Sequence, residues 1–437
     1  SRGLGDVYKR QIPICLETLF YMLSGMVDTL MLSAVGDYAV GAVGTANSYI
    51  GIFIIMFSII SSGMVSVMTQ NIGAGRPGVA YQARQLGLLF NAVAGVLMAV
   101  FLFSGAGAIL RMVGIADALY EPALIYLKIV GGGCILNAVI PIFSSYLRAF
   151  GYTKQPLYAT IVGNIANFVM NAVFLFVLHK GVAGVATATV ISKILNLCIV
   201  LYFSHKLISA KNSTERIANK TVLGQIVKVG LPSACETALY NVAMMLVIRF
   251  LNQMDAEGLN VTARSYTATI SNFSYCVGAA LAQANAIMTG WHIGAGKLEE
   301  CDRGTKRAAF VGVCVAVCME TAIVLGSGFI MPLFTDNPEM TALVRKLLAI
   351  DIVLEIGRVT NLVFGQALKT SGDAVFPAVI AAVFMFVFAV GGTWLFGISM
   401  GLMAVGAYIG LASDECVRAV GMVWRWKTGK WRTKKLV

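Results

Sequence analysis

Charged side chains are scarce in this sequence. Asp, Glu, Lys and Arg make up 12% of the 437 residues, whereas hydrophobic residues make up 58%. Soluble domains carry roughly twice that share of charge, so the composition excludes a chain built from soluble domains. Apolar runs of about 20 residues recur along the whole length, and each is long enough to cross a bilayer as a helix. We therefore expect an all-α polytopic membrane protein in contact with the lipid bilayer.

Motifs of catalysis and metal binding are also missing. The three histidines fall near the ends of apolar runs, and no HExxH, paired-histidine or Ser-His-Asp pattern is present. The nine cysteines form no CxxC pair, which predicts reduced thiols and no metal site among them. The net charge of +12 comes from basic residues in short loops, a distribution typical of membrane orientation. The sequence thus predicts no enzyme, no cofactor and no nucleic-acid partner.

The apolar runs predict twelve membrane-spanning helices. Several runs exceed the length of a perpendicular span, so tilted or protruding helices are expected. The predicted spans cover residues 12–34, 45–69, 86–110, 121–146, 156–178, 182–204, 223–251, 261–289, 307–331, 342–367, 374–397 and 400–424.

Basic residues gather in alternate connections. They follow each even-numbered span, as Arg76, Arg148 and Lys211 illustrate, and they fill the C-terminal tail, while the opposite loops carry acids such as Asp117 and Asp336. The positive-inside rule then predicts a multi-pass protein of the plasma membrane with both termini cytoplasmic. Because each half holds an even number of spans, the two halves are predicted to be parallel repeats.

Two stretches of the chain occur twice. Residues 13–17 (PICLE) return as residues 232–236 (PSACE) at an offset of 219, and residues 72–76 (IGAGR) return as residues 293–297 (IGAGK) at an offset of 221. An offset this steady indicates two halves of similar architecture. Internal repeats of apolar helices are typical of secondary transporters.

The repeat defines the predicted domains. Residues 1–11 read as a polar, Gly-rich run that resembles translated adapter DNA, and we expect this run to be foreign and dispensable. The other predicted parts are an N-terminal lobe (12–204, helices 1–6), a basic cytoplasmic linker (205–222), a C-terminal lobe (223–424, helices 7–12) and a basic cytoplasmic tail (425–437).

Asp28 is the sharpest candidate for function. It lies in the middle of an apolar span, where a carboxylate costs several kcal/mol unless it is protonated, paired or bound to an ion. Asn167 and Asn171 lie four residues apart and so share one helix face, and Thr187 follows in the next span. Their oxygens beside one carboxylate predict either a hard-cation site or a proton-linked hydrogen-bond network. Polar contacts that only join helices are the alternative.

Three further acids lie inside predicted spans. Glu236, like Glu17, follows a proline by four residues, which suggests a structural role at a kinked helix. In span ten, Asp351, Glu355 and Arg358 share one face, which predicts an internal Glu355–Arg358 pair.

Aromatic and methionine side chains are plentiful, and most are expected to pack or to face lipid. A subset suits a greasy, adaptable binding cavity. The candidates for lining it, together with one acid, are Glu17, Tyr21, Tyr49, Tyr240, Met244 and Tyr266.

At these residues the sequence resembles the MATE family, the multidrug and toxic compound extrusion transporters. The resemblance covers nearly everything from residue 13 to residue 424. Each matching piece is weak alone, and together they are specific. They are Pro13 with residues 27–28 (VD), residues 70–76 (QNIGAGR), residues 148–156 (RAFGYTKQP), Asn167 with Asn171, and residues 181–186 (GVAGVA).

The resemblance implies two six-helix lobes forming a V. It also implies antiport, in which lipophilic, often cationic drugs or toxic compounds leave in exchange for H⁺ or Na⁺. Pro13 matches the bending proline of the family's first helix, Asp28 its ion-coupling carboxylate, and Asn167 and Asn171 the partners in helix five, so that a bound Na⁺ would lie among these three polar residues. We expect a monomer with no cofactor other than the coupling ion.

The sequence departs from the family in the second half. Some members carry a carboxylate eight residues after the proline of helix seven, where this chain has Tyr240, and their helix-ten carboxylate falls on Arg358. Glu236, Asp351 and Glu355 are the candidates to replace a C-lobe coupling site.

Two other functions remain as alternatives. A lipid-linked precursor flippase of the same broad superfamily needs a strongly cationic cavity, whereas the well-embedded bases here are few: Lys128, Lys193, Arg249 and Arg358. A membrane enzyme is disfavoured by the missing catalytic patterns.

Overall fold

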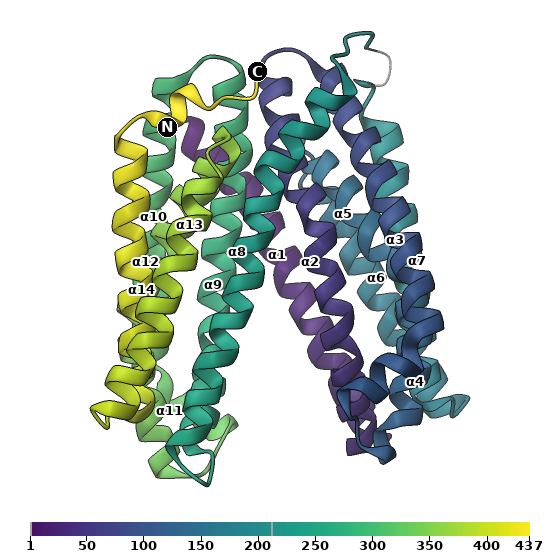
Figure 1. Cartoon of the computed structure of the whole chain (residues 1–437), viewed down its shortest axis with the longest axis vertical. Coiled ribbons are helices and arrows are strands. Elements are labelled where there is room, and N and C mark those ends of the chain that lie inside the picture. The colour runs from purple at the N-terminus through teal and green to yellow at the C-terminus, as the bar shows by residue number, and fades with distance from the viewer. Residues whose placement is uncertain (1, 211–212) are drawn as a thin grey trace. The chain divides into compact units, whose positions relative to one another are not determined.

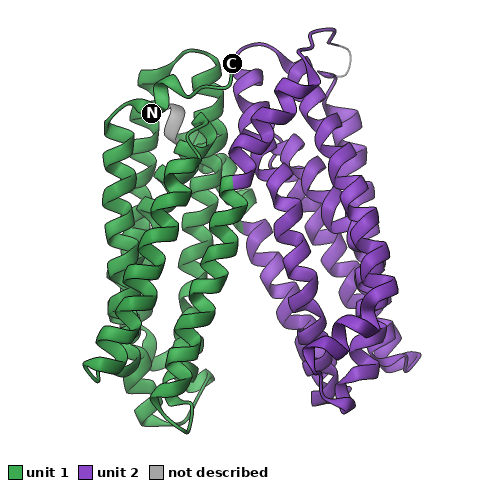
Figure 2. Cartoon of the chain, viewed as in Figure 1, with its two compact units in different colours: residues 1–15, 232–437 green, residues 16–231 purple. Residues whose placement is uncertain are grey.

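The chain folds into helices. The computed structural model describes residues 2–210 and 213–437, and within them the backbone forms helices and short connections with no β-strand (Figure 1). Ser1 and Lys211, which belong to the predicted foreign run and to a predicted basic loop, lie outside the described residues. The helices divide into two compact units, Ser1–Cys15 with Pro232–Val437 (unit 1) and Leu16–Leu231 (unit 2) (Figure 2).

Unit 2 holds the helices of the first half. Its core is a cluster of buried apolar side chains that includes Phe57, Leu102 and Leu127. Its elements are α1 (Arg2–Ser33) beyond Cys15, α2 (Asp37–Gly73), α3 (Pro77–Val113), α4 (Asp117–Gly132), α5 (Cys134–Ala149), α6 (Lys154–Ala172) continued by the π-helix η1 (Val173–Val177), α7 (Gly181–Leu207) and the start of α8 (Asn219–Met254).

Unit 1 holds the helices of the second half. One core cluster includes Ala284, Val363 and Trp426, and a second includes Val247 and Leu347. After α8 its elements are α9 (Leu259–Gly294), α10 (Leu298–Leu325), α11 (Ser327–Ile330), η3 (Met331–Leu333), α12 (Pro338–Ser371), α13 (Val375–Phe384), the π-helices η4 (Met385–Val390) and η5 (Thr393–Ser399), α14 (Met403–Lys427) and η6 (Lys430–Thr433).

Each predicted span coincides with a helical stretch, but most of the helices are longer than predicted. Span two was predicted at 45–69, for example, whereas α2 runs over Asp37–Gly73. Span nine ends earlier than predicted, because α10 stops at Leu325, before Gly326, and Pro332 falls in the short η3 that follows. Proline lacks the N–H that a continuing helix needs.

Span four is wrong as one continuous helix. The predicted segment 121–146 divides into α4 and α5, which meet at an angle of 41°. Residues 131–133 at the break are three consecutive glycines, which carry no side chains and have poor helix propensity. Gly131 also packs against Leu102, where a Cβ would be crowded. The glycines therefore permit both the bend and a close approach to α3.

Length and apolar composition identify eight described helices as able to cross a membrane, or nine if α4 and α5 count as one span. Two of the remaining long helices, α12 and α14, carry charged residues near their middles, which lowers their hydropathy. Glu355 on α12 and Asp414 on α14 are buried in the bundle, so these helices hide their charges from lipid.

The described part of the N-terminal run is helical and packed. Val7 is buried in the same core cluster of unit 1 as Ile14, and the Gln11 amide donates a hydrogen bond of 3.2 Å to the Val277 carbonyl. This run was predicted to be polar and dispensable. Its packing gives it a place in unit 1, and whether the protein needs it stays a prediction.

The two repeated prolines mark where helices change units. Pro13 lies inside α1, which passes from unit 1 to unit 2 after Cys15, and Pro232 lies inside α8, which passes from unit 2 to unit 1 at that residue. Both helices continue through their proline. The division inside α8 lies beyond the linker predicted at 205–222.

Glycines allow α2 and the first part of α8 to touch within unit 2. A Cβ on Gly63 would collide with the Ile226 carbonyl, and a Cβ on Gly230 would collide with the Ile59 carbonyl. Small residues at such a crossing let two backbones approach closely, which is a main source of helix association in lipid.

We predict that Gly230→Val destabilises the protein by about 1–3 kcal/mol, because the added side chain overpacks this crossing. The matched control is Gly224→Val, six residues earlier in α8, where a Cβ would meet nothing within 4 Å. Thermal unfolding of both purified variants in detergent checks this. Equal midpoints for the two variants would contradict the proposed close contact.

Candidate functional site

Asp28 is held by two asparagines from another helix. In unit 2, Nδ2 of Asn167 and Nδ2 of Asn171 both donate to Oδ1 of Asp28, at 2.8 and 2.6 Å. The asparagines are one turn apart on α6 and are 5% and 0% exposed, so α6 presents both amides to the same carboxylate of α1. The structure therefore brings together the three residues that the sequence analysis grouped.

Thr187 does not join this group. Its hydroxyl donates to the Ala183 carbonyl of its own helix α7, at 2.8 Å, as threonine often does inside helices. The charge that acts on Asp28 from α7 is instead Lys193, whose ammonium donates to Oδ1 of Asn137 at 2.8 Å. The sequence analysis treated Lys193 only as an embedded base.

The amide oxygens of both asparagines remain free to accept. Within the described chain, Oδ1 of Asn167 and Oδ1 of Asn171 are buried and have no hydrogen-bond partner. Together with the Asp28 carboxylate they form a group of oxygen atoms, which is the type of ligand that hard cations prefer. Na⁺ would suit this donor set, and so would a proton on Asp28.

The repeated glutamates form equivalent ion pairs. In unit 2, Glu17 on α1 pairs with Arg148 at 2.5 Å; in unit 1, Glu236 on α8 pairs with Lys369 at 2.6 Å. The acids are 219 residues apart (236 − 17) and the bases 221 apart (369 − 148), so the repeat preserves the contact. Each pair ties the first helix of its half to the end of the fourth, which favours the structural role proposed for Glu17 and Glu236.

Unit 1 encloses a cavity of about 490 Å³. Its wall includes Tyr240, Met244 and Glu236, three of the residues proposed from the sequence, together with Asp351 and residues of α9 and α14. The polar groups that line it include acids and bases in equal number: Glu236, Asp351, Asp414 and Glu415, and Arg264, Arg358, Lys369 and Arg418.

The other proposed lining residues lie elsewhere. Tyr266 belongs to unit 1 but packs against Phe334, with ring centroids 5.6 Å apart. Glu17, Tyr21 and Tyr49 belong to unit 2, and the Tyr21 side chain is 72% exposed. They do not line the unit 1 cavity.

Ion pairs neutralise most of the cations in the cavity wall. Arg358 contacts Glu355 at 2.5 Å, as the sequence predicted, and its Nε lies 3.7 Å from Glu415. Arg418 contacts Asp414 at 2.9 Å and Glu415 at 3.1 Å.

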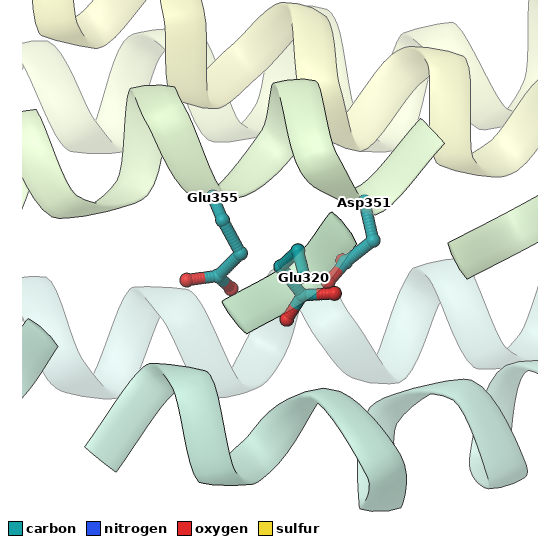
Figure 3. Close-up of side chains that lie close together, drawn as sticks. All are labelled: Glu320, Asp351 and Glu355. Carbon is teal, nitrogen blue, oxygen red and sulfur yellow. The ribbon is translucent and has the colours of Figure 1, made fainter. Parts of the chain in front are cut away.

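Three carboxylates converge beside this network. Glu320 on α10 and Asp351 and Glu355 on α12 each place a carboxylate oxygen within 4.8 Å of the others, and we call this group the acidic triad (Figure 3). Sequence reasoning found Asp351 and Glu355 but missed Glu320, Asp414 and the bases opposite. The missed signal was the one that identified Asp28, a charge inside an apolar run.

These features define a class of protein. A helical membrane bundle that combines an amide-held carboxylate with an enclosed, charged cavity has the architecture of a secondary transporter. A model of the MatE family matches residues 13–173 and 232–395, in both halves, and the chain belongs to this family of membrane transporters.

Individual relatives agree with this assignment. The chain is 32% identical to the "Uncharacterized transporter YisQ" of Bacillus subtilis (strain 168), over 97% of this chain and 94% of that protein. It is 20% identical to the "Probable multidrug resistance protein NorM" of Thermotoga maritima, over 99% and 94%.

Solved structures confirm the predicted fold. A mutant of the Vibrio cholerae MATE transporter VcmN matches with a TM-score of 0.89 at 17% identity, over 100% of this chain and 98% of that chain. The fold is accordingly an all-α polytopic one, with twelve transmembrane helices in two lobes of six.

We predict that Glu236→Gln lowers the free energy of unfolding by about 2 kcal/mol, because the Lys369 ammonium loses a charged hydrogen-bond partner. Glu257→Gln, at an exposed acid of the α8–α9 loop, is the matched control. Thermal unfolding in detergent measures both. The swapped double variant Glu236→Lys with Lys369→Glu should recover stability, and failure to do so would mean that the pair itself is not what stabilises unit 1.

Proposed function

We propose that the protein is a secondary antiporter of the plasma membrane that exports lipophilic, often cationic compounds in exchange for H⁺ or Na⁺. The observation that carries the proposal is the Asp28 carboxylate, held by the Asn167 and Asn171 amides at 2.8 and 2.6 Å inside a membrane bundle. An ionisable group at such a place marks an ion pathway more often than a structural contact. Family membership and the name of the Thermotoga maritima relative support the same activity.

Asp28 can couple an ion to a movement of helix α1. With the carboxylate charged, both asparagine amides bind one oxygen and tie α1 to α6. A proton or Na⁺ on Asp28 weakens the demand for these donors and draws on the free amide oxygens of Asn167 and Asn171 instead. The change in contacts gives the two states of the helix pair different affinities for the ion, which is the condition for any ligand-driven shift. Pro13 is the natural place for α1 to bend.

The unit 1 cavity is the proposed place of the exported compound. Its volume of about 490 Å³ falls within the range of small-molecule sites. Tyr240, Tyr275 and Tyr408 offer aromatic faces to an organic cation, and Met244 adds an adaptable apolar surface. We further propose that a single chain suffices for transport and that both termini face the cytoplasm.

The flippase alternative is weaker on the same cavity. An anionic head group needs free positive charge, but Arg358, Arg418 and Lys369 are each paired with a carboxylate. Among the described cations of the cavity wall, Arg264 alone makes no ion pair; its guanidinium contacts Met244 sulfur at 3.8 Å. One unpaired guanidinium is a poor match for a lipid-linked precursor.

We predict that cells expressing the protein accumulate less ethidium, a lipophilic cation, than cells carrying an empty vector. The paired charges and aromatic wall of the cavity are the physical reason, since they tolerate a cation and offer little to an anion. Whole-cell fluorescence measures the accumulation. Unchanged ethidium together with transport of an anionic lipid-linked sugar would favour the flippase.

We predict that Asp28→Asn abolishes gradient-driven efflux while leaving folding and cavity binding intact. Asparagine keeps the shape of the side chain but removes its titratable charge. The measurement is efflux from proteoliposomes under separately imposed H⁺ and Na⁺ gradients, which also identifies the coupling ion. The expected rate for the mutant is that of protein-free liposomes.

Asp255→Asn, at an acid of the α8–α9 loop, is the control and should transport like the wild type. Wild-type efflux by Asp28→Asn, with unchanged dependence on the gradient, would move the coupling site to Glu236, Asp351 or Glu355.

A further inference from the structure

The acidic triad is fully enclosed. Glu320, Asp351 and Glu355 are 0%, 2% and 0% exposed, and their nearest carboxylate oxygens lie within 4.8 Å of one another (Figure 3). Charges at this spacing repel strongly where water does not screen them, and like carboxylates that share one site do not all ionise together.

The groups that face the triad supply too little positive charge to balance it. Glu355 contacts Arg358 on its own helix, but Arg358 also faces Glu415 on α14, and Arg418 on α14 is engaged by Asp414 and Glu415. The described acids of this network thus outnumber its guanidinium groups by five to two. The polar neighbours from α9 and α14 are neutral: Ser271, Ser274 and Tyr408.

Hydrogen bonding leaves the same group incomplete. Across the described chain, neither carboxylate oxygen of Glu320 has a hydrogen-bond partner of good geometry, and Oδ2 of Asp351 and Oε2 of Glu355 also have none. Ionised carboxylates only accept, so facing oxygens cannot satisfy one another. A protonated carboxyl carries an O–H and can donate to its neighbour, which lowers the charge and satisfies an acceptor at once.

We propose that the acidic triad is a proton-binding site in unit 1, in which Glu320 takes up a proton and shares it with Asp351 across an O–H···O⁻ hydrogen bond. The proton comes from water and returns to water through Asp351, the one triad member that lines the 490 Å³ cavity. No other bond forms or breaks. The triad lies in unit 1, whereas Asp28 lies in unit 2, so the proposal goes beyond the coupling role of Asp28 and stands without it.

The site has a consequence for the cavity. Asp351 belongs to both the triad and the cavity wall, so a positively charged solute beside Asp351 and a proton on the triad repel each other. Binding of an organic cation should therefore expel the proton, and uptake of the proton should weaken binding of the cation. Reciprocity of this kind is required of any coupled pair of ligands.

Infrared spectroscopy of the purified full-length chain in lipid tests the proposal. The carbonyl stretching band of protonated carboxylic acids is followed as pH is raised. We expect a component of this band in the wild type that disappears in Glu320→Gln and persists in Asp28→Asn, the control that removes the intramembrane carboxylate of unit 2. Replacing Na⁺ by choline at constant ionic strength and pH should leave this component unchanged.

Two outcomes would overturn the proposal. If Glu320→Gln left the band unaltered, the triad would hold no proton at Glu320. If Na⁺ removed the component at constant pH, the triad would be a metal site. Should Glu320→Gln fail to fold, Asp351→Asn provides the second reading: a shared proton requires the pH at which the component titrates to move, and an unchanged titration contradicts sharing. These readings do not involve transport, so they stay distinct from a failure of the proposed antiport.

Discussion

A buried charge in a membrane bundle must find a partner, and this constraint explains where the polar residues of the protein lie. Lipid offers neither hydrogen bonds nor counter-charge, so an isolated ion there costs several kcal/mol. Glu17 meets Arg148, Glu236 meets Lys369, and Arg358 meets Glu355. Asp28, in contrast, is met by two neutral amides. Amides satisfy the oxygen without fixing its charge, which leaves this carboxylate free to exchange a cation.

The two halves share a scaffold but place their charges differently. The Glu17–Arg148 and Glu236–Lys369 pairs recur at the repeat offset, as a contact that supports the helix arrangement should. A second contact recurs with altered charge. Lys193 binds Asn137 in unit 2, and in unit 1 the positions 222 and 221 residues later hold Glu415 and Arg358, which face each other at 3.7 Å. The base lies on the sixth helix of the first half and on the fourth helix of the second.

Local patterns in the sequence were enough to predict the spans, the Asp28 group and the Glu355–Arg358 pair. Each depends on spacing along one helix or on a lone charge in an apolar run. Glu320 gave the same local signal, but its meeting with Asp351 depends on how α10 packs against α12, which spacing does not encode. The bend at residues 131–133 needed three glycines to be weighed against a hydropathy run that continues through them. The Thr187 hydroxyl turned to its own backbone, a local competitor that a count of oxygens overlooks.

The contrast between the two carboxylate groups bears on how one chain can move two ligands. The Asp28 group is a single acid with neutral donors, and it can switch between charged and neutral states at little cost to its surroundings. The unit 1 network joins acids and bases around a cavity, so a change at one member redistributes the partners of Arg358 and Arg418. A cation that enters this cavity competes with those guanidinium groups for the same carboxylates. Recognition of the compound and occupancy by small cations are therefore linked through shared oxygens, and this linkage requires no change in the helix scaffold that the repeated ion pairs hold.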